Sequence, residues 1–101
     1  MASWQSLRKK LVEILGNSNV YYNPPEDIRI SYPCIIFQLE DIERRSADNI
    51  GYIKKRRYQL KLIDYVPDNP AIDKLMDLPY CAFDRSYKAD NLNHDILEIY
   101  W

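Results

Sequence analysis

The feature that most constrains the fold is a pair of strand-like segments separated by a charged stretch. Residues 34–40 open with the longest apolar run of the chain, Cys-Ile-Ile-Phe. In residues 52–66, apolar side chains recur at every second position: Tyr58, Leu60 and Leu62. Side chains alternate between the two faces of a strand, so both segments suit a sheet. The stretch 41–51 is polar and contains Gly51, which predicts an extended loop or a hairpin tip. Together the three segments predict a β-hairpin whose far end projects beyond the core.

An amphipathic helix is predicted over residues 3–15. Apolar side chains recur there at spacings of three and four: Trp4, Leu7, Leu11, Ile14 and Leu15. This spacing gathers them on one helix face, which has to pack against another element. Ser3 is a suitable N-terminal cap, and Gly16 stands where a left-handed residue commonly ends a helix.

The remaining elements are short. Strands are expected over residues 20–22, 80–87 and 93–101, and a second helix is expected to end at about Leu78, before Pro79. The buried stripe expected for that helix is Ile72, Leu75 and Met76. The side chains expected on one face of the strand 80–87 are Cys81, Phe83 and Tyr87. The order of elements predicts a single domain over residues 1–101, of the α+β class, with a mainly antiparallel sheet and a protruding hairpin.

Composition excludes several kinds of site. The 101 residues include two glycines, which are too few for a phosphate loop or a dinucleotide fingerprint. The lone histidine, His94, excludes two-histidine zinc motifs. Fourteen basic and fifteen acidic side chains give a formal net charge of −1, so no whole-molecule field attracts nucleic acid. We expect no cofactor, no metal, no membrane span and no signal peptide, and therefore synthesis in a cytoplasm.

Two groups of residues are candidates for catalysis. Cys34 or Cys81 with His94 would make a nucleophilic dyad, but both cysteines lie in apolar, strand-like stretches. We expect both to be buried, reduced thiols. An acidic cluster is formed by Glu40, Asp41 and Glu43, and the basic residues that follow it favour local ion pairs in a solvated loop over a catalytic or calcium site. The sequence thus indicates no enzyme.

Basic side chains concentrate on the two limbs of the predicted hairpin. They are Arg44, Arg45, Lys54, Lys55, Arg56 and Arg57. Three interpretations stay open: a protein interface, a solvent-exposed hairpin protected from edge aggregation by its charges, or a nucleic-acid contact. Strand alternation would split the group, because Lys54 and Arg56 would face away from Lys55 and Arg57.

The nine tyrosines add a modest argument for an oligomer. Most lie in or beside predicted strands, where amphipathic rings suit half-buried faces. In an adjacent pair such as Tyr21 and Tyr22, one ring has to point away from the core. Several exposed rings on one small domain favour association between copies.

Several short blocks, in order along nearly the whole chain, carry a family resemblance. They are Tyr22-Asn23-Pro24-Pro25-Glu26, Tyr32-Pro33-Cys34-Ile35-Ile36-Phe37 with Glu40-Asp41 behind it, Ala47-Asp48-Asn49, the stretch from Tyr58 to Asp64, Phe83-Asp84-Arg85, and Ala89-Asp90-Asn91-Leu92-Asn93-His94-Asp95. In these blocks the sequence resembles the small tail-terminator, or tail-completion, proteins of long-tailed, siphovirus-like bacteriophages. No catalytic signature accompanies the blocks.

The resemblance implies a structural role in the virion. Proteins of this family are α+β domains that form a six-fold homo-oligomeric ring on the tail tube, end its polymerisation and join it to the head-side connector. The implied partners are other copies of the chain, the major tail tube protein and a head-completion protein, and DNA passes through the lumen without sequence-specific binding. The implied location is the tail or neck of the virion, assembled in the bacterial cytoplasm. The alternatives are a head-closure or adaptor protein of the neck, or a small nucleic-acid-binding module that uses the basic hairpin.

Overall fold

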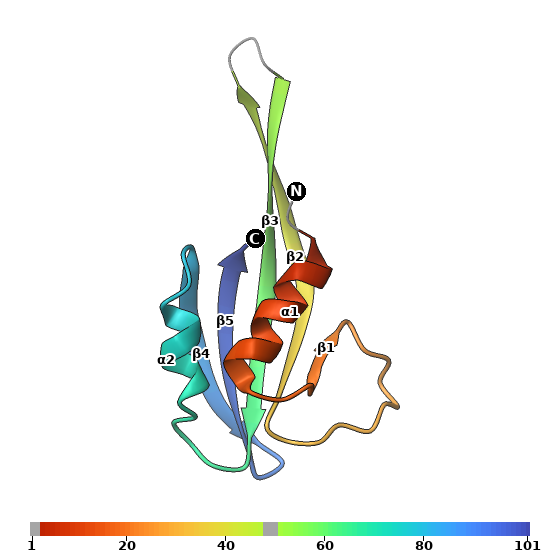
Figure 1. Ribbon diagram of the computed structural model, residues 1–101, viewed down its shortest axis with the longest axis vertical. Helices are drawn as coiled ribbons and strands as arrows, with labels where there is room; N and C mark the ends of the chain where they lie inside the picture. The colour runs from red at the N-terminus through yellow and green to blue at the C-terminus, as the bar shows by residue number, and fades with distance from the viewer. Residues whose placement is uncertain (1–2, 48–50) are drawn as a thin grey trace.

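The protein is a five-stranded sheet with two helices on one face (Figure 1). The structure, a computed structural model, describes residues 3–47 and 51–101. The helices are α1 (Trp4–Leu15) and α2 (Ala71–Met76), and the strands are β1 (Val20–Tyr22), β2 (Cys34–Ala47), β3 (Gly51–Asp64), β4 (Cys81–Ala89) and β5 (Leu92–Tyr100). The strand order is β1-β2-β3-β5-β4, in which β1 alone is parallel to its neighbour. The predicted α+β class with a mostly antiparallel sheet is confirmed.

Helix α1 begins and ends as the sequence predicts. The Ser3 hydroxyl accepts a hydrogen bond from the backbone N–H of Ser6, and the Ser6 hydroxyl accepts one from the N–H of Ser3. This reciprocal pair satisfies two N–H groups that have no partner within the helix. At the other end Gly16 has φ +84°, and its N–H donates to the carbonyl of Val12. Leu7 and Leu11 are the buried residues of the helix.

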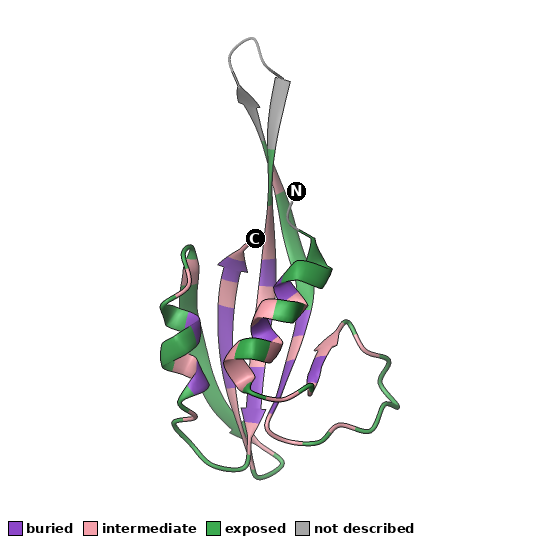
Figure 2. Cartoon of the chain, in the orientation of Figure 1, coloured by how far each residue is buried: buried purple, intermediate pink, exposed green. Residues whose placement is uncertain are grey.

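The core lies between the helices and one face of the sheet, as the burial colours of Figure 2 show. The predicted alternation on β3 is confirmed, because Tyr58, Leu60 and Leu62 are all buried. Aromatic rings link α1 to the sheet: Trp4 stacks on Tyr22 at 4.7 Å, and Tyr22 lies 4.9 Å from Phe37. Phe37 in turn meets Tyr58 edge-on at 6.2 Å. This aromatic cluster packs beneath the point where the hairpin leaves the sheet.

The predicted hairpin is present, and its first strand is longer than expected. The loop predicted over residues 41–51 is wrong for 41–47, because β2 continues through Ala47 opposite β3. A polar, charged stretch can stay in a strand where the neighbouring strand supplies its backbone hydrogen bonds and water solvates its side chains. A bulge between Leu39 and Asp41 shifts the register at the start of this extension. Residues 48–50 lie outside the described residues, so the predicted tip is not described.

Two further expectations are corrected around β4. A register shift between Phe83 and Arg85 moves one residue out of the alternation, so Phe83 pairs with Leu97 whereas Tyr87 pairs with His94. Leu97 and His94 lie three residues apart, which places Phe83 and Tyr87 on opposite faces and not on the same one. Helix α2 ends at Met76, before the expected Leu78, and Met76 is 41% exposed and not part of a buried stripe.

Candidate functional site

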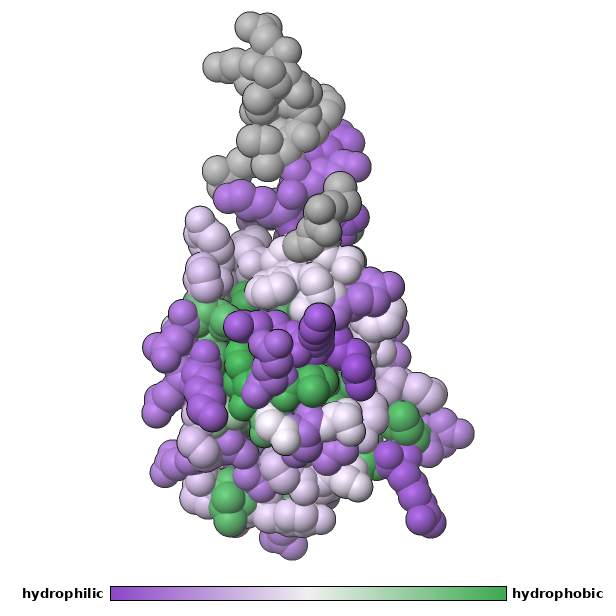
Figure 3. Space-filling model, viewed as in Figure 1, coloured by the Kyte–Doolittle hydropathy of each residue, from purple (hydrophilic) through white to green (hydrophobic). Residues whose placement is uncertain are grey.

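A cleft of about 480 Å³ lies where the hairpin leaves the sheet. Its lining combines charged and aromatic side chains: Glu43, Lys54, Lys55, Arg56, Tyr80, Tyr100 and Trp101. Figure 3 shows hydrophilic side chains gathered at the base of the hairpin. Three of the six basic residues singled out in the sequence therefore belong to one hollow in the surface.

Backbone hydrogen bonds hold the end of β5 against the other walls of the cleft. The N–H of Tyr100 donates to the carbonyl of Tyr80, and the N–H of Trp101 donates to the carbonyl of Arg56 at 3.0 Å. The Trp101 indole Nε1–H donates to the Ser6 hydroxyl at 2.8 Å, which ties the end of the chain to α1. The cleft is thus built from segments that lie far apart in the sequence.

Tyr80 forms an exposed rim of the cleft. It has φ +62°, in the left-handed region that bulky side chains rarely adopt, and its side chain is 80% exposed. A strained backbone that presents a large ring to solvent is a feature that clusters at functional sites. The sequence marks Tyr80 only as one of many tyrosines beside strands.

Arg57 differs from Lys54, Lys55 and Arg56 because it forms ion pairs with side chains that the structure describes. Its guanidinium lies 3.5 Å from the Glu40 carboxylate and 3.8 Å from the Asp41 carboxylate. A side-chain hydrogen bond with Tyr100 is the largest cause that raises the pKa of Arg57, and Glu40 adds to it. The Tyr100 hydroxyl also donates to Glu43 at 3.4 Å. The ion pairs of this acidic cluster with Arg57 thus cross to β3, and they do not join the cluster to the basic residues that directly follow it.

Lys54, Lys55 and Arg56 form no ion pair with any side chain that the structure describes. Lys54 and Lys55 are exposed, and Arg56 is half-buried. The ladder pairs Arg56 with Ile42 and Lys55 with Glu43, so the expected alternation of faces holds. Both faces nevertheless contribute to the cleft, because the hairpin twists where it separates from β5. Arg44 is exposed, and the side chain of Arg45 lies outside the described part of the chain.

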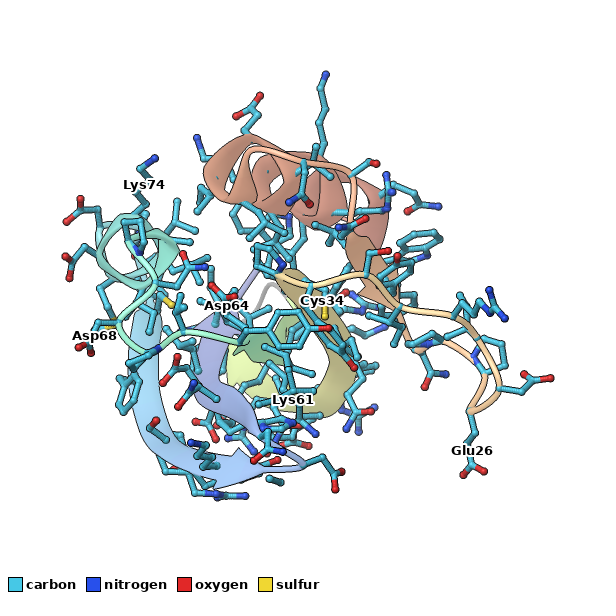
Figure 4. The ribbon with its side chains drawn as sticks, turned by 90° about the horizontal axis from the view of Figure 1, so that it is seen from below. Glu26, Cys34, Lys61, Asp64, Asp68 and Lys74 are labelled. Atoms are coloured by element: carbon cyan, nitrogen blue, oxygen red, sulfur yellow. The ribbon has the colours of Figure 1, made fainter. Side chains whose placement is uncertain are left out.

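The candidate thiol dyad is not brought together. Cys34 pairs with Ile63 on the next strand, and Ile63 pairs with His94 on the strand after that, which separates Cys34 from His94 by two strand spacings, about 10 Å. Burial, with a smaller effect of Asp64, raises the pKa of Cys34 to about 12. Cys34 begins β2 and Asp64 ends β3, at the end of the sheet away from the projecting hairpin (Figure 1), and Figure 4 shows both residues from that end. Burial raises the pKa of Cys81 to about 11. The His94 ring stacks on Tyr87 at 4.7 Å.

Residues 3–44 and 54–101 contain no group of three or more histidine, cysteine or acidic side chains placed to hold a metal ion. Neither α1 nor α2 is long and apolar enough to cross a membrane.

Sequence reasoning identified the basic side of the cleft and missed its aromatic side. Tyr100 and Trp101 face Arg56 and Arg57 because β5 pairs with β3 up to Arg57, and that register is set by the whole sheet. No model of a known protein family matches the chain, and a search of curated proteins finds no match.

Proposed function

We propose that this protein is a non-enzymatic structural protein of a bacteriophage virion, a tail terminator. In this role a ring of copies caps the tail tube and joins it to the head-side connector. The sequence blocks that resemble tail terminators support the proposal. Most of them lie in the sheet and its connections, on β2, β3, β4 and the turn into β5.

The observation that carries the proposal is the hairpin that projects beyond the sheet (Figure 1). Strand β1 pairs with β2 only as far as Phe37, and β5 pairs with β3 only as far as Arg57. Beyond these points, in the described part of the chain, no third strand pairs with either arm, and the molecule measures 52 Å along its longest axis. An isolated two-stranded hairpin is marginally stable in water, so an arm of this kind suits contact with another molecule.

The surface of the hairpin suits protein contact better than nucleic acid. Leu39 and Ile42 are exposed apolar side chains on it, and Glu43 shares the cleft with the cations. The whole chain carries a net charge of −1, which does not favour a polyanion. The combination of basic, aromatic and apolar side chains is typical of protein interfaces.

Electron microscopy of isolated tails tests the proposal. Gold-labelled purified protein is expected on the head-proximal end of tails, and the protein alone is expected to form rings. Label at the connector of DNA-filled heads, with none on tails, would instead indicate a head-closure or adaptor protein. Absence of the protein from virions, together with no binding to tails, would overturn the proposal.

A further inference from the structure

Exposed apolar and basic side chains share one face of the hairpin. Ile42 lies directly opposite Arg56 in the ladder, and Leu39 lies opposite Tyr58. Directly paired residues of antiparallel strands share a face, as do residues two apart along a strand, so Lys54 lies on this face as well. We call Leu39, Ile42, Lys54 and Arg56 the hairpin surface. Leu39 and Ile42 are exposed although they are large and apolar.

A second surface with the opposite charge lies on α2 and the edge strand β4. Phe83 pairs with the buried core residue Leu97, so it lies on the face of the sheet that α2 covers. Its side chain is 43% exposed there. Helix α2 packs against β4, and Asp73, Met76 and Asp77 are all exposed at this helix. We call Asp73, Met76, Asp77 and Phe83 the α2–β4 surface. It also has exposed apolar side chains beside charges, here negative.

Asp73 lies in the first turn of α2, where the helix dipole favours negative charge, whereas Asp77 does not help the helix. Asp73 and Asp77 are four residues apart, where like charges on one helix face repel each other. Asp77 caps the C-terminus of α2, where the helix dipole disfavours negative charge. An electrostatic cost to a helix that no neighbouring side chain offsets is expected where a residue serves contact with another molecule. Neither carboxylate forms an ion pair with a side chain that the structure describes.

The two surfaces belong to segments of opposite net charge. Residues 40–57 carry six basic and four acidic side chains, a net charge of +2, whereas residues 64–90 carry three basic and six acidic side chains, a net charge of −3. In the fold the hairpin projects from one end of the sheet, while α2 lies beside β4 (Figure 1). Two different complementary surfaces on one chain suit head-to-tail association, in which a ring can close.

We infer that the hairpin surface of one copy docks on the α2–β4 surface of a second copy. The inference rests on the ring assembly proposed above and identifies the two faces that meet. Ile42 and Leu39 cover Met76 and Phe83, while Lys54 and Arg56 face Asp73 and Asp77. The contact is made by side chains and not by adding a strand to β4, because the bulge and the charges of Asp84, Arg85 and Lys88 protect that edge.

A charge-swap experiment tests this pairing. Variant H carries Lys54→Glu with Arg56→Glu, and variant A carries Asp73→Lys with Asp77→Lys. Each variant alone opposes like charges at the contact, so its self-association measured by analytical ultracentrifugation at low salt should weaken by more than about tenfold. An equimolar mixture of H and A pairs opposite charges at every contact and should assemble again. Raised salt should reduce all of these differences.

A matched control changes the same charge elsewhere. Lys9→Glu with Arg29→Glu alters two exposed cations outside both surfaces and should assemble as the unsubstituted protein does. Far-ultraviolet circular dichroism and thermal melts establish that each variant is folded. If Arg56→Glu prevents folding, Lys54→Glu alone serves as variant H.

The outcomes separate the inference from the proposed function. Assembly of H or A alone, or a mixture that stays dissociated, overturns the inference, and the tail-labelling experiment still decides the role in the virion. An unsubstituted protein that remains monomeric at every concentration also overturns it. Loss of DNA binding by H with unchanged self-association would assign the hairpin to nucleic acid and would overturn it too.

Discussion

Phe37→Leu is expected to lower the free energy of unfolding by about 1–3 kcal/mol. Phe37 is fully buried and meets two rings, Tyr22 at 4.9 Å and Tyr58 at 6.2 Å. Each aromatic pair contributes about 0.5–1.5 kcal/mol beyond the burial of its area. Leucine keeps most of the apolar burial and loses both pairs, which gives the range. Phe37→Ala adds a cavity and should cost about 3–5 kcal/mol, a large share of the roughly 5–15 kcal/mol that stabilises a domain of this size.

The same substitution at Phe83 is the matched control. Phe83 lies on the edge strand and is 43% exposed, so Phe83→Leu should change the free energy of unfolding by less than about 0.5 kcal/mol. Because Phe83 belongs to the α2–β4 surface, Phe83→Leu should weaken self-association instead. The two phenylalanines thus separate packing of the fold from contact between copies.

Urea denaturation followed by circular dichroism measures both effects. The measurements are made in the Lys54→Glu/Arg56→Glu background, since association of the folded protein would otherwise add to its apparent stability. The denaturant slope should stay constant, so a lower midpoint reports lower stability. A loss below about 0.5 kcal/mol for Phe37→Leu, or an equal loss for Phe83→Leu, would refute the packing argument for the aromatic cluster.

Four other measurements follow from the structure. Gly16→Ala should lower the free energy of unfolding by about 1 kcal/mol, because φ is +84°. No atom lies within 4 Å of the added Cβ, so backbone strain is the whole cost, and Gly16→Asn should cost less. Equal melting temperatures for all three proteins would contradict this. Native Cys34 and Cys81 should react slowly with iodoacetamide at pH 8 and rapidly in urea, since burial raises their pKa values to about 12 and about 11; rapid native labelling would exclude buried thiols. Because these pKa values are raised in the folded protein, the thiols lose their protons at lower pH in the unfolded chain than in the folded one. The free energy of unfolding should therefore fall as pH rises above about 9, and it should fall less in the double variant Cys34→Ala with Cys81→Ala. Arg57→Gln should lower the melting temperature more than Lys55→Gln does, because Arg57 lies among Glu40, Asp41 and Tyr100. Equal melting temperatures would show that this network adds no stability.

Two of the expectations that failed did so because a neighbouring strand decides the local structure. Residues 41–47 look like a loop because they are polar, yet they form a strand because β3 lies beside them. Tyr87 changes face because of a bulge whose position depends on the pairing of β4 with β5. Met76 has the spacing of a buried residue but lies at the end of a helix that stops early. In the first two cases the deciding neighbour lies on another element, whereas the exposure of Met76 goes with the end of its own helix.

What the sequence determines by itself is local. The cap at Ser3, the stop at Gly16 and the alternation of Tyr58, Leu60 and Leu62 depend on side chains a few residues apart, and all were predictable. Tertiary structure decides which charges are available for contact. Arg56 and Arg57 are adjacent in the chain, but Arg57 is held by Glu40, Asp41 and Tyr100, while Arg56 opens to the cleft with Tyr80 and Trp101. That difference follows from strand register, which places residues more than forty positions apart side by side, and no local pattern encodes it.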